Sequence, residues 1–233
     1  MENQILLGRS DRPVTLEGRF ANRHGLVAGA TGTGKTVSLL VLAEGFSRMG
    51  VPVFMADVKG DVSGLAAAGT LNEKIRQRAG ETGLGNFAPE ASPVVFWDLH
   101  GQTGHPVRTT ISEMGPGLMG RILQLNDTQA GLLDIAFKVV DDQGLLLLDL
   151  DDLRAVLSFL ADNRKEISTE YGLVSAQSIA AIQRSLLSLD QEGGKSFFGE
   201  PALDLSDLMR TDLTGRGIIS LLAADRLILQ PRL

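Results

Sequence analysis

The chain carries a glycine-rich segment that reads GATGTGKT over residues 29–36. A short apolar run, residues 26–28, precedes it, and an apolar stretch with helical character, Val37 to Phe46, follows it. This order is typical of a strand, a phosphate-binding loop and a helix. The glycines let successive backbone N–H groups turn toward a polyphosphate, and the helix adds the positive end of its dipole. The sequence therefore predicts an anion socket at this loop.

Within the loop, two side chains have specific predicted roles. Lys35 would reach the β- and γ-phosphates of a nucleotide, and the Thr36 hydroxyl would help to hold the Mg²⁺ that bridges them. We expect both residues to be catalytic and Thr36 to be the metal ligand. The other predicted nucleotide-binding residues of the loop are Gly29, Thr31, Gly32, Thr33 and Gly34. The alternative is a glycine-rich turn that binds nothing.

Composition excludes several classes of site. With no cysteine, the chain can form neither disulfides nor thiolate metal sites, and its three scattered histidines do not suggest a metal centre. Its apolar stretches fall short of the roughly 20 residues that span a bilayer, so no membrane segment is expected and the cytoplasm is the predicted location. A net charge of −6 gives no overall attraction to nucleic acid, so any DNA contact needs local patches.

The apolar pattern predicts an α/β fold with a mostly parallel sheet. Beyond the loop helix, strands are expected at Val51 to Ala56, at Pro93 to Trp97 and at Gly217 to Ala224, with a further extended stretch from Pro106 to Ile111. Ligands of such sheets sit at the carboxyl ends of the strands.

Helical spacing dominates the middle of the chain, from about Ser112 to Gly194. The sequence therefore predicts residues 1–111 as the first part of a nucleotide-binding core, residues 112–194 as an inserted helical subdomain, and residues 195–233 as a return to the core sheet. The apolar helix faces are most simply packing surfaces.

A hydrolytic site also needs an acidic residue at the end of a neighbouring strand. Four apolar runs end in aspartate, and none has glutamate directly after it; these aspartates are Asp57, Asp98, Asp149 and Asp225. Asp149 leads into a helical pattern, which favours a capping role. Asp57 ends the strand after the loop helix and is expected to bind the nucleotide; the alternative is a turn in which its side chain satisfies only the backbone.

Five segments together resemble one family. They read NRHGLVAGATGTGKT, VPVFMADVKGDVSGLA, ISEMGPGLMGRILQLNDTQ, FFGEPALDLSDLMRTD and RGIISLLAAD, and they span nearly the whole chain. They look like the HerA-like P-loop ATPases of the HerA and FtsK group, and most of all like the bacterial YjgR-like branch.

The resemblance implies a RecA-like P-loop core and membership of a group of hexameric, ATP-driven motors that act on duplex DNA. Lys35 and Thr36 carry over directly as Walker A residues. In that family the Asp-Glu strand end (Walker B) and the arginine that acts across subunits lie later than any segment matched here. The chain is therefore expected to be an N-terminal half with a core that is incomplete at its C-terminus.

The leading hypothesis is an ATP- and Mg²⁺-binding ATPase domain. By resemblance, its partners would be further copies of the chain, in a homo-oligomer, and duplex DNA. The alternative is a nucleotide-binding or assembly module without hydrolysis, motivated by the missing Asp-Glu pair. A small-molecule kinase would need a second motif for the phosphate acceptor, and the sequence contains none. Guanine specificity would need an Asn-Lys-x-Asp segment, which the sequence also lacks.

Overall fold

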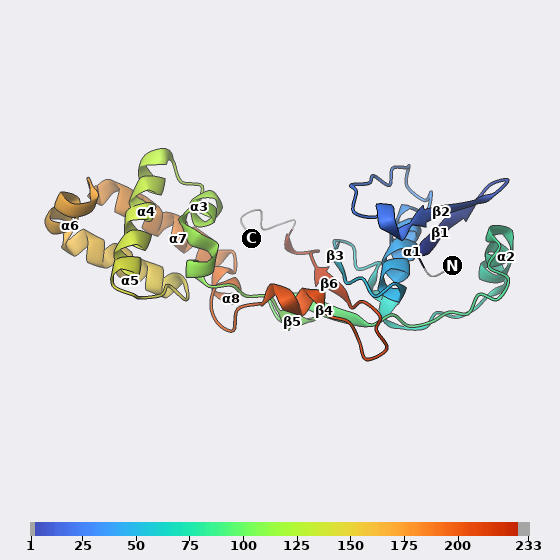
Figure 1. Ribbon diagram of the computed structural model, residues 1–233. Coiled ribbons are helices and arrows are strands. Elements are labelled where there is room, and N and C mark those ends of the chain that lie inside the picture. Colours follow the sequence, from blue (N-terminus) through green and yellow to red (C-terminus); the bar gives the residue numbers. More distant parts are fainter. Residues whose placement is uncertain (1–2, 228–233) are drawn as a thin grey trace. The chain divides into compact units, whose positions relative to one another are not determined.

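A computed structural model describes residues 3–227, in which the chain forms two compact units (Figure 1). The sheet unit takes in the chain as far as Trp97 together with Asp204–Asp225, and the helical unit takes in Asp98–Leu203 and continues after Asp225. The units divide after residues 97 and 203, whereas the sequence analysis divides the chain after residues 111 and 194. Each unit is described by itself below.

The sheet unit begins with an antiparallel hairpin of β1, Gln4–Arg9, and β2, Pro13–Glu17. From its arginines, this segment was expected to be a solvated surface or, alternatively, a contact with nucleotide phosphates or a neighbouring subunit, and no hairpin was predicted. The hairpin was missed because its polar residues outnumber its apolar ones and its register contains an irregularity between Leu6 and Gly8.

The main sheet follows the predicted strand and helix order. Helix α1 spans Lys35–Arg48, and β3, Val53–Asp57, pairs in parallel with β6, Ile219–Ala223. The strand order is β3-β6-β4-β5. The two remaining strands of this sheet are β4, Val94–Asp98, and β5, His105–Pro106. The fold is thus mixed α/β, and the predicted strands near residues 53, 94 and 219 are confirmed.

A small apolar core joins α1 to this sheet. Its buried members are Ala43, Val62, Leu65, Ile219 and Leu221. Beside it, the fully buried Ser47 hydroxyl donates a 2.6 Å hydrogen bond to the Gly217 carbonyl, and the Gly217 N–H donates to the Ser47 carbonyl at 2.8 Å. These two bonds fix the C-terminal end of α1 to the start of β6.

One predicted strand is wrong. Residues 26–28 are irregular, and Leu26 is 89% exposed, because no strand within residues 3–227 pairs with this short run. The extended stretch predicted from Pro106 to Ile111 ends one residue early: β5 includes Pro106, Thr109 forms a parallel bridge with Phe198, and Thr110 is extended. Thr110 and Glu113 form a capping box, which begins helix α3 at Ile111.

The helical unit is an α-helical bundle around a leucine-rich core. Its helices are α3 Ile111–Ile122, α4 Asp127–Asp142, α5 Leu150–Asp162, α6 Arg164–Tyr171, α7 Ala176–Gln191 and α8 Gly194–Phe197. Leu133, Leu153, Leu157, Ile182 and Leu186 are fully buried where α4, α5 and α7 pack together. The predicted helical stretch is confirmed, and its status as an insertion in a RecA-like core stays a prediction.

Short helices complete the sheet unit. They are η1 Gly18–Phe20, η2 Ser63–Ala66, α2 Glu73–Thr82 and η3 Leu205–Met209. Helix η2 matters for the site because it follows β3 and buries Leu65 in the core beneath α1. Within the described part of the chain, no helix combines the length and apolar character needed to cross a membrane.

Candidate functional site

The glycine-rich loop closes over the carbonyl oxygen of Ala30. The Thr33 hydroxyl donates to that oxygen at 2.8 Å, and the Thr33 N–H donates to it at 3.4 Å. Gly32 and Gly34 adopt φ values of 81° and 91°, in the left-handed region that glycine enters without strain. A side chain at Gly29 would collide with the Thr33 hydroxyl. The glycines at 29, 32 and 34 are therefore each required by the loop conformation.

Lys35 begins α1 and folds back over the loop. Its Nζ donates a 2.7 Å hydrogen bond to the same Ala30 carbonyl. Gly34, the N-cap residue, offers no side chain to the helix, and the first turn of α1 contains no acidic residue. The helix therefore starts with N–H groups that no capping side chain satisfies, beside an ammonium group. An anion of the size of a phosphate group fits this donor set.

Thr36 contacts the carboxylate of Asp61, which was not among the predicted site residues. Its hydroxyl donates to Asp61 Oδ2 at 3.3 Å. Asp61 is exposed and lies between β3 and η2, four residues after Asp57. A second acid four residues after the strand-end Asp57 was a sequence signal for this contact.

Asp57 is turned inward instead. Its side chain is 8% exposed and accepts hydrogen bonds from the backbone N–H groups of Lys59, Gly60 and Val62, at 3.2, 2.7 and 3.3 Å. These contacts match the turn that the sequence analysis kept as an alternative. The tentative nucleotide contact of Asp57 stays a prediction.

The side chains of Asp98 and Asp149 accept hydrogen bonds from backbone groups of the residues that follow them. Burial alone would raise the pKa of Asp98, but backbone N–H groups of His100, Thr103 and Gln102 and the Thr103 hydroxyl lower it to about 2. Asp149 caps α5 by accepting from the N–H groups of residues 151 and 152, which confirms its predicted capping role.

No cluster of three or more His, Asp or Glu side chains suited to a metal ion occurs within residues 3–227. Asp225 follows β6 and is exposed. Arg226, the next residue, donates to Gln102 Oε1 at 2.8 Å. Any metal held by the protein at the loop would therefore rely on few protein ligands, as Mg²⁺ commonly does beside phosphates.

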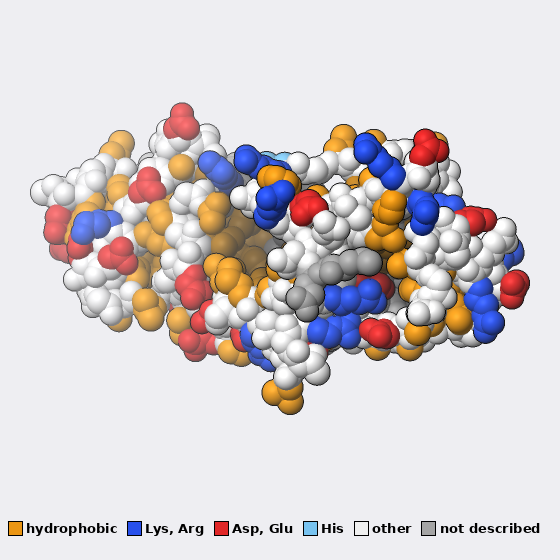
Figure 2. Space-filling view, turned by 45° about the vertical axis from the view of Figure 1, so that its right-hand side comes forward, with side chains coloured by type: hydrophobic (Ala, Val, Ile, Leu, Met, Phe, Trp, Pro, Cys, Tyr) orange, Lys and Arg blue, Asp and Glu red, His pale blue; other side chains and the backbone are white. Residues whose placement is uncertain are grey.

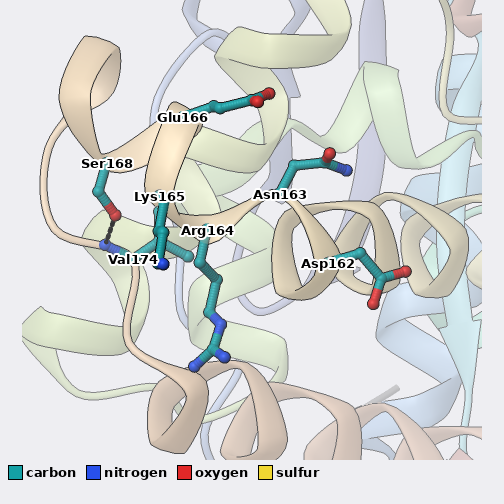
Figure 3. Close-up of a pocket in the computed structure, with 7 residues that line it drawn as sticks. All are labelled: Asp162, Asn163, Arg164, Lys165, Glu166, Ser168 and Val174. Carbon is teal, nitrogen blue, oxygen red and sulfur yellow. Dashed lines mark hydrogen bonds between the residues drawn. The ribbon is translucent and has the colours of Figure 1, made fainter.

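A separate pocket of about 680 Å³ lies in the helical unit, around the junction of α5 and α6. Figure 3 shows that the Arg164 and Lys165 side chains point away from the carboxylate of Asp162, and that Ser168 Oγ accepts a 3.0 Å bond from the Val174 N–H. None of its lining residues belongs to the glycine-rich loop. No sequence motif indicated this pocket.

Comparison with known proteins identifies a family over almost the whole chain. Residues 2–233 match the family described as Helicase HerA-like C-terminal. No curated protein sequence matches the chain.

Proposed function

We propose, from the premise that this chain belongs to the HerA-like helicase C-terminal family, that its glycine-rich loop binds ATP with Mg²⁺ as part of an ATPase domain. One observation carries the proposal. Lys35 and the uncapped start of α1 are held on a loop whose Gly32 and Gly34 adopt conformations that favour glycine. Such a loop offers N–H donors and a fixed positive charge to a triphosphate.

Lys35, Thr36 and the N–H groups of α1 would each contact a different part of the bound nucleotide and metal. Lys35 would exchange the Ala30 carbonyl for a phosphate oxygen and offset the charge that develops on the γ-phosphate. The N–H groups at the start of α1 would hold the β-phosphate, and Thr36 would place its hydroxyl toward the metal. Mg²⁺, when bound, neutralises charge on the β- and γ-phosphate oxygens.

The first experiment measures ATP affinity by calorimetry for the wild type and for Lys35→Ala. The variant should bind at least about ten-fold more weakly, which corresponds to about 1.4 kcal/mol. Lys74→Ala removes an exposed lysine of α2, in the same unit but outside the loop and the β3 turn, and serves as the control. Equal affinity of the wild type and Lys35→Ala would refute ATP binding at this loop.

Hydrolysis is the second measurement. Mg²⁺-dependent phosphate release that disappears in Lys35→Ala supports the ATPase. Micromolar binding without release favours the alternative function, a nucleotide-binding or assembly module.

The finer family properties belong to the same proposal. We infer a homo-oligomer, specifically a hexamer, that acts on duplex DNA in the cytoplasm, and we propose that the chain falls in the YjgR-like branch of the family. On the face shown in Figure 2, basic and acidic side chains are interspersed. DNA binding would therefore depend on local patches of basic side chains.

Light scattering tests for the hexameric ring, and stimulation of ATP hydrolysis by duplex DNA tests for the motor activity. A monomer whose ATP hydrolysis does not respond to DNA would contradict both.

A further inference from the structure

We propose that Asp61 is a metal-holding residue of this site, and that its carboxylate and the Thr36 hydroxyl together hold the Mg²⁺ that accompanies the nucleotide. This inference rests on the proposed function. It assigns a role to an acid that neither the loop motif nor the strand-end pattern selects.

The distance between the two side chains suits one small cation. Thr36 Oγ1 and Asp61 Oδ2 are 3.3 Å apart. Mg²⁺ takes six oxygen ligands at about 2.1 Å in an octahedron, so neighbouring ligand oxygens lie about 3.0 Å from each other. A movement of a few tenths of an ångström would let both oxygens bind the same ion, and a water molecule could join Asp61 to it without any movement.

The turn after β3 makes Asp61 available and Asp57 unavailable. The Asp57 carboxylate is held by three backbone N–H groups, and Gly60 turns the chain with a φ of 73°. Val62, the next residue after Asp61, is only 6% exposed and belongs to the core under α1. Asp61 is thus fixed on both sides while its own side chain faces solvent beside the first turn of α1.

Charge supports a cation at this place. Within the described residues, no Lys, Arg or His side chain forms an ion pair with Asp61. A carboxylate beside a phosphate socket repels the nucleotide unless a positive ion lies between them. Asp61 should therefore make nucleotide binding depend on the metal.

The test uses Mn²⁺ as the probe, with a non-hydrolysable ATP analogue and electron paramagnetic resonance to count free Mn²⁺. Asp61→Asn keeps the shape of the side chain and should weaken Mn²⁺ binding to the protein–nucleotide complex by about ten-fold to a hundred-fold. The affinity for the analogue in EDTA should stay equal or increase, because a negative charge is lost. Asp11→Asn, at the exposed end of the β1–β2 hairpin, removes the same charge as the control.

Three other results would contradict the role of Asp61 or the proposed function. Unchanged Mn²⁺ affinity in Asp61→Asn, with normal nucleotide binding by the wild type, would overturn the role of Asp61 alone. Equal weakening in Mn²⁺ and in EDTA would show that Asp61 supports the loop and would also overturn it. A wild type that binds no nucleotide would overturn the proposed function as well. Asp61→Glu, which keeps the carboxylate, should recover part of the Mn²⁺ affinity.

Discussion

Burial decides which acid of the β3 turn is free for chemistry. Asp57 is buried, and its carboxylate accepts hydrogen bonds from three backbone N–H groups. Asp61 is exposed and accepts a hydrogen bond from the Thr36 hydroxyl. A sequence shows both as aspartates near the end of a strand. The difference comes from the path of the turn, which the pattern of residues does not reveal.

Asp98 should make stability depend on pH in the acid range. Its side chain is 7% exposed, and its pKa in the folded chain is about 2, against 3.8 for the free group. A lowered pKa adds stability that is complete above the unfolded value and is lost as the pH falls toward the folded value. The full contribution is about 2 kcal/mol, of which about 1 kcal/mol is lost by pH 3.

Urea unfolding of the wild type and Asp98→Asn at pH 6 and pH 3 measures this contribution. The advantage of the wild type should shrink by about 1 kcal/mol at pH 3. Asp134→Asn, on the exposed side of α4, removes a similar charge without these bonds. An advantage that is the same at both pH values would contradict the assignment.

At the scale of elements, the close approach of the chain before β3 to the start of β6 leaves no room for a side chain at Gly217. A Cβ there would collide with the carbonyl group of Val51 and lie 2.6 Å from the Pro52 nitrogen. Gly217→Ala should therefore push β6 away from its partners and strain the Ser47 bonds, at a cost of about 1–3 kcal/mol.

Thermal unfolding followed by tryptophan fluorescence measures the effect of Gly217→Ala, because Trp97 is the single tryptophan and lies in β4. Gly8→Ala is the matched control, since a Cβ at Gly8 would meet nothing within 4 Å. Equal stability of the two variants would show that the backbone can move aside at Gly217 without cost.

The elements that the sequence predicted are those whose signals are local. Helices α4, α5 and α7 follow their apolar spacing, and β3, β4 and β6 follow apolar runs bounded by turns. The loop was predicted because its residues are contiguous. The strand predicted at residues 26–28 is absent and the β1–β2 hairpin was not predicted, since a strand depends on which partner lies beside it. The contact between Thr36 and Asp61 joins residues 25 positions apart, so it needed the structure.

At the scale of the whole molecule, the described residues form two apolar cores of different size, one in each unit. The core of the helical unit includes buried residues from Ile111 to Phe198, whereas that of the sheet unit consists of a few residues from α1, β6 and the segment between β3 and α2. Larger apolar burial gives greater stability. The sheet unit should therefore unfold at lower urea concentration than the helical unit.

Two probes can separate the units, because Trp97 reports on the sheet unit and far-ultraviolet circular dichroism reports mainly on helices α3 to α8. The fluorescence transition should come first. Mg²⁺ and ATP at a hundred times the dissociation constant should stabilise only that transition, by about 2.7 kcal/mol. The same ligand should leave the fluorescence transition of Lys35→Ala unchanged. Coincident transitions that shift together would mean that the two cores unfold as one cooperative unit, and that nucleotide binding at the loop stabilises the helices as strongly as the sheet.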